Sequence, residues 1–262
     1  MTPGSDVGKA SRVATFVIVH GAWGGGWEWT PVAQALRQRG HEVFTPTLTG
    51  LGERAHLARR EVGLSTHVED VVGLLELEDL HDVVLCGASY GGMPVTGAAD
   101  RAASRVRLVI NVDALVPRDG QSTLDLLPGA FGEIVRAAAA APGEAWRVAI
   151  PREVLPPQGM APPGERARYV ARLRDQPAET FIEPVRLTGA IERLPRAFVR
   201  CIRGGLDQAI GEDPIAPCAD RARAEGWPYR ELATPHDPQL ADPASTAAVL
   251  DELATARMRS GP

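Results

Sequence analysis

The stretch Val83-Val84-Leu85-Cys86-Gly87-Ala88-Ser89-Tyr90-Gly91-Gly92 determines how the rest of the chain is interpreted. Its apolar start predicts a buried strand, and the G-x-S-x-G pattern leads from it into a helical stretch. A serine on such a turn is held in a strained backbone conformation, and Gly87 and Gly91 let strand and helix approach closely. The helix amino terminus favours negative charge beside the hydroxyl. We therefore expect Ser89 to be a nucleophile on a nucleophile elbow, the alternative being a glycine-rich turn with an incidental serine.

The composition is that of one globular domain. With 262 residues, 44% of them hydrophobic, the chain can bury a large core. It lacks the long apolar run that a membrane-spanning helix needs, and residues 1–11 lack the apolar core of a signal peptide, so we expect a flexible tail there. A net charge of −5 with scattered arginines argues against nucleic acid as a partner.

The cysteines indicate a reducing environment. Cys86, Cys201 and Cys218 are odd in number and show no C-x-x-C spacing, which predicts neither a disulfide framework nor a zinc site. Cys86 and Cys201 fall in predicted strands, where a free cysteine packs as a small core residue. We expect a cytoplasmic protein without metal or cofactor. The oligomeric state is left open, a homodimer being one option.

Strand and helix patterns alternate along the chain. Apolar runs predict strands at 12–20, 41–48, from 83, 106–115, 197–202 and 229–232, and amphipathic stretches predict helices at 30–39, 65–80, 93–105, 217–225 and 243–258. This alternation predicts an α/β fold with a mostly parallel central sheet and helices on both faces.

Residues 116–195 interrupt that alternation. The stretch is rich in proline, contains an alanine-rich helix around 135–141 and has a proline-glycine linker at 156–164. Long excursions from compact domains usually carry function. We therefore expect a single domain, 1–262, with a core at 12–115 and 196–259 and an inserted cap at 116–195 over the active face.

A serine hydroxyl is a weak nucleophile and needs an adjacent base, which an acid must orient. Of six histidines, only His236 follows Ser89 in the chain. It lies in the loop Thr234-Pro235-His236-Asp237-Pro238, between the last predicted strand and the last helix. From there a histidine can reach back across the strand ends, so His236 is the candidate base rather than a lone surface histidine.

Two aspartates are candidates for the acid. Asp207 lies just beyond the strand 197–202, and Asp113 lies at the end of the strand next to the elbow. Either carboxylate could accept the imidazole N–H, and we favour Asp207 with Asp113 as the alternative. Asp213 and Asp237 are interpreted as helix or turn caps.

The oxyanion formed on acyl attack needs two preorganised donors. The residue after the nucleophile, Tyr90, provides one backbone N–H. The second is expected in His20-Gly21-Ala22-Trp23, after the first strand, with Ala22 as the donor and Gly21 and Trp23 lining the substrate pocket. A phosphate-binding loop is the competing interpretation, but no Gly-Lys-Ser/Thr follows the glycines.

Four motifs together carry a family resemblance: 20–23 (HGAW), 46–54 (PTLTGLGER), 87–92 (GASYGG) and 236–238 (HDP). The chain resembles α/β-hydrolases near the plant methyl esterases and hydroxynitrile lyases, in particular their bacterial carboxylesterase relatives. The resemblance implies an α/β-hydrolase fold and cofactor-free hydrolysis of small carboxylic esters. It also implies a catalytic triad of Ser89, His236 and Asp207, with an oxyanion hole formed by Ala22 and Tyr90.

Departures from the family pattern narrow the reaction. Lyases of this group carry threonine where Gly21 stands and lysine where Asp237 stands, so cyanohydrin cleavage is not expected. The bacterial relatives often have histidine where Ala88 stands. Two other functions stay open beside ester hydrolysis: ligand binding with little turnover, and acyl or thioester hydrolysis or cyclisation in natural-product synthesis.

Overall fold

A six-stranded sheet lies at the centre of the computed structural model, which describes residues 13–127, 129–151, 155–156, 163–203 and 213–256. The strand order is β2-β1-β3-β4-β7-β8, and each neighbouring pair is parallel. The strands are β1 (Thr15–Val19), β2 (Glu42–Phe44), β3 (Val83–Ala88), β4 (Val106–Val112), β7 (Arg196–Cys201) and β8 (Tyr229–Leu232). The predicted α/β class with a parallel sheet is confirmed.

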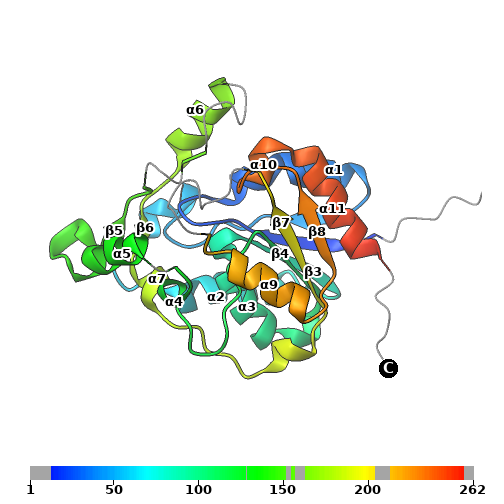
Figure 1. Cartoon of the computed structure of the whole chain (residues 1–262), viewed down its shortest axis with the longest axis horizontal. Helices are drawn as coiled ribbons and strands as arrows, with labels where there is room; N and C mark the ends of the chain where they lie inside the picture. Colours follow the sequence, from blue (N-terminus) through cyan, green and yellow to red (C-terminus); the bar gives the residue numbers. More distant parts are fainter. Residues whose placement is uncertain (1–12, 128, 152–154, 157–162, 204–212, 257–262) are drawn as a thin grey trace, which may run out of the picture.

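Each face of the sheet is covered by its own set of helices (Figure 1). Side chains alternate along β1, so that Val17 and Val19 enter one hydrophobic cluster and Phe16 and Ile18 the other. The first cluster includes residues of α2 (Leu64–Leu77), α3 (Gly92–Arg101) and α9 (Ala216–Ala224). The second includes residues of α1 (Thr30–Gln38) and α11 (Pro243–Thr255), which pack against each other.

Most predicted elements are present with shifted ends. The strand expected at 41–48 is only three residues long, β2, because Pro46 follows shortly after and has no N–H to donate to a sheet. The helix expected from Ser65 begins at Leu64, and its N-cap, Gly63, provides no side-chain cap. Instead, the carboxylate of Glu183 accepts the backbone N–H of Ser65 at 2.9 Å. A residue distant in sequence thus performs the capping.

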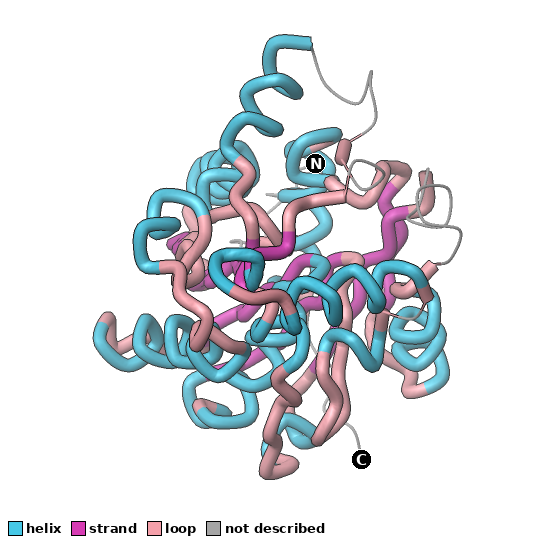
Figure 2. Tube along the Cα trace, turned by 90° about the vertical axis from the view of Figure 1, so that its left-hand side faces the viewer, coloured by secondary structure: helices cyan, strands magenta, loops and turns pink. Residues whose placement is uncertain are grey.

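Between β4 and β7 the chain leaves the sheet. The excursion contains α4 (Thr123–Leu126), α5 (Ala130–Ala140), β5 (Arg147–Val148), α6 (Pro163–Arg172), β6 (Gln176–Pro177) and α7 (Glu179–Ile182). β5 and β6 pair antiparallel. Figure 1 shows this green to yellow-green segment gathered at one side of the sheet, and Figure 2, seen from that side, shows helices and loops in front of the strands. The division into core and cap remains a prediction.

Several other expectations concern composition. Cys86 and Cys201 are free and buried, as expected for core cysteines, and Cys218 is also free and buried. Within the described ranges, no helix combines the length and apolarity needed to cross a membrane. The predicted tail at 1–11, and 157–162 of the predicted linker, lie outside the described residues, whereas Pro163 and Gly164 already belong to α6.

Candidate active site

Ser89 occupies a strained turn between β3 and α3. Its φ is 51°, in the left-handed region that non-glycine residues seldom adopt. A Cβ on Gly87 would lie 2.6 Å from the carbonyl oxygen of Gly91, and a Cβ on Gly91 would lie 2.5 Å from that of His20. Only glycine fits at either position. The expected elbow, with a strained serine between two obligatory glycines, is confirmed.

A continuous hydrogen-bonded chain runs from Ser89 through His236 to Asp113. His236 Nε2 lies 2.8 Å from Ser89 Oγ, and His236 Nδ1 lies 2.7 Å from Asp113 Oδ2. The carboxylate can only accept, so Nδ1–H donates to it and Nε2 is left to accept the serine proton. The elements involved are the elbow after β3, the end of β4 and the loop after β8. Parallel strands bring these three points to one edge of the sheet.

Asp113 is held firmly in this position. Its φ is 43°, and its Oδ1 accepts hydrogen bonds from Arg200 Nη1 at 2.6 Å and from the Cys201 backbone N–H at 3.2 Å. Arg200 also pairs with Asp213. Asp207, which the sequence analysis favoured as the acid, lies outside the described residues. The aspartate that the structure places beside the histidine is the alternative, Asp113. This follows because β4 is adjacent to β3 and its end lies beside the elbow.

The environment of His236 tunes its basicity. Burial disfavours the charged imidazolium, but the hydrogen bond from Nδ1 to Asp113 and the negative charge of that aspartate outweigh it. The result is a pKa of His236 above its usual 6.5. Such a histidine is a stronger base than a free imidazole, and Asp113 stabilises its protonated form.

The loop after β1 lies against Ser89. A Cβ on Gly21 would lie 3.2 Å from Ser89 Cβ and 3.8 Å from Ser89 Oγ, so the Gly21 backbone runs beside the reacting hydroxyl. His20 fixes this loop, because its Nδ1–H donates to the Gly21 carbonyl at 2.7 Å and its Nε2 accepts the Leu48 N–H at 3.1 Å. Burial lowers the pKa of His20 to about 4, so the ring stays neutral at physiological pH. His20 is thus a supporting residue.

Trp23 connects this loop to the excursion. Its backbone N–H donates to Gln176 Oε1 at 2.8 Å, and its indole N–H donates to the Val148 carbonyl at 2.9 Å. Its φ of 63° turns the chain sharply after Ala22. Trp29, further along the same segment, is fully buried in the core.

One cavity contains all the sequence-predicted site residues that the structure describes except Asp113. It is lined by Ser89, His236, Ala22, Tyr90, Gly21 and Trp23. Other walls come from the excursion, through Leu127, Ile150, Tyr169, Leu173 and Phe181. The lining is mostly apolar, as is usual for a small-molecule site. Among the described residues, no group of three or more His, Cys, Asp or Glu side chains is arranged to hold a metal ion.

A second hydrogen-bond network, partly buried, supports Tyr90 next to Ser89. The Tyr90 hydroxyl donates to His67 Nδ1 at 2.9 Å, and His67 Nε2–H donates to the Thr49 carbonyl at 2.9 Å. Thr49 in turn donates to Asp70 through its N–H and its hydroxyl, at 2.6 and 2.8 Å. Arg54 pairs with that carboxylate at 3.1 Å. The conspicuous Thr49-to-Arg54 motif therefore positions Tyr90.

Sequence reasoning missed several of these groups. His67 was given no role within the predicted helix 65–80, although it is buried with Val68 and Val71. Arg200 could not be recognised from the sequence, because a single arginine within a predicted strand does not show which carboxylate it pairs with. Asp213 caps the turn that precedes α9, since its Oδ1 accepts hydrogen bonds from the N–H groups of Ile215 and Ala216 at 3.0 and 3.1 Å; this agrees with the expected helix or turn cap.

Asp237 was wrongly interpreted as a cap. It occupies the N-cap position of α10 (Pro238–Ala241), but its side chain makes no capping hydrogen bond. Instead, its Oδ1 accepts the hydroxyl of Tyr169 at 3.3 Å, and it lines the cavity. The reason is tertiary: the excursion places a tyrosine hydroxyl within reach of this carboxylate.

Comparison with known proteins defines the class that this fold and site indicate. A sequence model described as the alpha/beta hydrolase family matches residues 16–249, so the chain belongs to that family. It is 54% identical over 119 residues to a carbendazim hydrolyzing esterase of Nocardioides sp. (strain SG-4G), covering 45% of this chain and 49% of that protein. It is also 30% identical over 132 residues to the putative methylesterase 14, chloroplastic, of Arabidopsis thaliana, covering 50% and 38%. The matched regions span half or less of these relatives.

Solved structures agree on the fold. An extracellular alpha/beta-hydrolase from a Paenibacillus species has a TM-score of 0.77 at 22% identity, covering 94% of this chain and all of that one. A methylesterase from Arabidopsis has a TM-score of 0.68 at 22% identity, covering 91% and 97%. The expected α/β-hydrolase fold and the resemblance to plant methyl esterases are confirmed.

Proposed function

We propose that the chain is a serine carboxylesterase that hydrolyses small carboxylic esters through an acyl-enzyme. The observation that carries the proposal is the hydrogen-bonded chain from Ser89 Oγ through His236 to Asp113, opening into an apolar cavity. Esterase and methylesterase relatives support the same reaction.

The mechanism follows from the geometry. His236 Nε2 takes the proton of Ser89 as the oxygen attacks the ester carbonyl. The developing oxyanion accepts hydrogen bonds from two backbone N–H groups. One belongs to Tyr90, at the start of the helix, and the other to Ala22, in the loop beside the nucleophile. The imidazolium then protonates the departing alcohol. Water, deprotonated by the same histidine, attacks the acyl-enzyme and releases the acid.

We assign the acid role to Asp113 in preference to Asp207. A histidine has one Nδ1–H to donate, and Asp113 Oδ2 lies 2.7 Å from that nitrogen. The second carboxylate oxygen is fixed by Arg200 and by a backbone N–H, which orients the acceptor rigidly. This arrangement has the properties that a triad acid needs.

The test is hydrolysis of p-nitrophenyl acetate by the parent protein, by Ser89→Ala and by Ser104→Ala, a matched control at an exposed position. Ser89→Ala should lose at least a thousandfold in kcat, and Ser104→Ala should match the parent. Parent activity that survives in Ser89→Ala would refute the proposal. A parent that captures ligands without turnover would favour a binding protein, and preference for thioesters would favour the acyl-transfer alternative.

Location and assembly are part of the proposal. Three free, buried cysteines suit the reducing cytoplasm, where thiols persist. A small-molecule ester is the proposed partner, and size-exclusion chromatography with light scattering would decide between a monomer and a homodimer.

A further inference from the structure

A buried pair of carboxyl groups lies in the wall of the cavity, outside the triad. Glu28, in the 3₁₀ helix Gly26–Trp29, is only 6% exposed, and Asp237 follows the proposed base directly. Both side chains line the cavity that contains Ser89. Neither takes part in the ester hydrolysis derived above, so their presence needs a separate reason.

Glu28 has an unused hydrogen-bonding atom. Among the described residues, its Oε1 has no hydrogen-bond partner although it is fully buried. The carboxyl lies over Gly24, where a Cβ would approach Oε1 to 2.1 Å, so the glycine leaves room for it. A buried carboxyl oxygen without a partner costs free energy, unless a ligand supplies the missing donor.

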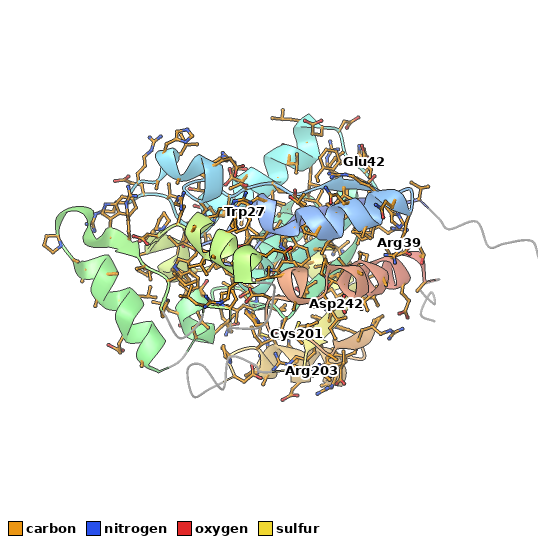
Figure 3. All side chains as sticks on the ribbon, turned by 90° about the horizontal axis from the view of Figure 1, so that it is seen from above. Trp27, Arg39, Glu42, Cys201, Arg203 and Asp242 are labelled. Atoms are coloured by element: carbon orange, nitrogen blue, oxygen red, sulfur yellow. The ribbon has the colours of Figure 1, made fainter. Side chains whose placement is uncertain are left out.

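Neighbouring groups orient the pair. Tyr169 is a hydrogen-bond partner of Glu28 as well as of Asp237, and His236 is the one basic side chain among the described residues that line the cavity. The Tyr169 hydroxyl donates a hydrogen bond to Asp237 at 3.3 Å and accepts one from Gln239 Nε2 at 3.4 Å. The ring of Tyr169 meets that of Trp27 edge-on, with centroids 5.2 Å apart, and Figure 3 shows Trp27 beside helix α6, which carries the tyrosine. None of the described residues lining the cavity is a lysine or an arginine.

The two acids also influence each other. Burial and the nearby charge of Asp237 raise the pKa of Glu28 well above its ordinary value, and burial likewise raises the pKa of Asp237. Two carboxyl groups in one low-dielectric wall resist simultaneous ionisation. A positive charge placed between them would relieve this, because a desolvated cation forms strong charge-assisted hydrogen bonds to carboxylates.

We infer that Glu28 and Asp237 form a specificity site for a protonated nitrogen base, an amine or an amidine, carried by the ester substrate. The N–H groups of the base donate to the unpartnered oxygen of Glu28 and to Asp237, while its carbon skeleton packs against Leu173 and Phe181. This inference rests on the proposed esterase function, because only an esterase would treat the bound molecule as a substrate. The binding site itself can be tested without turnover.

The test compares benzamidine, which carries a planar amidinium, with acetophenone, a neutral molecule of similar shape. Isothermal titration calorimetry at pH 8 should show the parent binding benzamidine at least tenfold more tightly. In Glu28→Gln this preference should fall to threefold or less. Glu76→Gln, the same exchange at an exposed site on α2, should keep the parental preference. Benzamidine should inhibit p-nitrophenyl acetate hydrolysis competitively, which places it in the cavity.

Equal binding of the two probes by the parent, or an unchanged preference in Glu28→Gln, would overturn the inference. The ratio of two affinities cancels any general loosening of the pocket. If Glu28→Gln does not fold, as judged by thermal unfolding, Asp237→Asn replaces it, and a preference retained there would overturn the paired site. An inactive parent that still prefers benzamidine would refute the proposed esterase and leave the binding site standing.

Discussion

Replacement of Asp113 by asparagine tests the centre of the proposed mechanism. The amide is nearly the same size but offers a donor as well as an acceptor where His236 Nδ1–H needs an acceptor 2.7 Å away. If its N–H₂ faces the ring, Nδ1 becomes the acceptor and the proton moves to Nε2, where it blocks deprotonation of Ser89. Loss of the negative charge also removes the main stabilisation of the imidazolium.

The expected magnitude is large. A wrong tautomer at the base of a serine triad costs about 10⁴-fold in kcat, which corresponds to about 5 kcal/mol of transition-state stabilisation. Because burial alone lowers the pKa of His236, the residual activity should also show its acidic limb at lower pH than the parent. Initial rates with p-nitrophenyl acetate, measured from pH 5 to 9, give both quantities.

Asp207→Asn is the comparison that makes this test decisive. We expect it to retain activity within a fewfold of the parent, since Asp113 already accepts the only Nδ1–H. Circular dichroism and thermal unfolding would check that Asp113→Asn still folds, because Arg200 loses one of its two carboxylate partners. A nearly inactive Asp207→Asn beside an active Asp113→Asn would refute the reasoning and return the acid to the loop after β7.

Three further predictions concern pH and packing. The raised pKa of His236 means that kcat/KM should rise with pH with a midpoint above 6.5, and a pH-rate profile checks this. Gly91→Ala should lower the free energy of unfolding by about 1–3 kcal/mol, because the new Cβ would lie 2.5 Å from the His20 carbonyl oxygen. Urea denaturation measures this loss. His20 has a folded pKa of about 4, below its usual 6.5, so the unfolded chain binds the extra proton and stability falls as pH drops through that window. This histidine should lower the free energy of unfolding by about 2 kcal/mol between pH 7.5 and pH 5, as measured by urea titrations at the two pH values. The difference should be smaller in His20→Asn.

Local signals made the strained turn at Ser89 predictable. The strained serine, the two glycines and the strand before them are consecutive in sequence, so Ser89 could be placed without tertiary information. His236 was predictable because it is the one histidine that follows Ser89. The loop with Gly21 and Ala22 was recognisable as a glycine turn after the first strand.

The acid could not be chosen from the sequence. Asp113 and Asp207 both follow strands of one parallel sheet, and the sequence does not show which carboxylate meets the imidazole. The 2.7 Å contact between Asp113 Oδ2 and His236 Nδ1 is seen only in the structure. The pocket wall was harder still. In the sequence, Glu28 is a charged residue near the start of a predicted helix. Its burial depends on the space left by Gly24 and on the excursion that carries Tyr169, and a pattern of apolar residues shows neither. Contacts between distant segments carry that information.

The position of Asp113 on β4 bears on how this protein can vary. The proposed triad acid is fixed by a strand end, a neighbouring guanidinium and a backbone amide, all belonging to the sheet. On this proposed assignment the acid depends on the sheet and not on a loop. Designed libraries that seek new substrates would then keep Asp113 and its partner Arg200 fixed, because these two residues hold the carboxylate that faces His236.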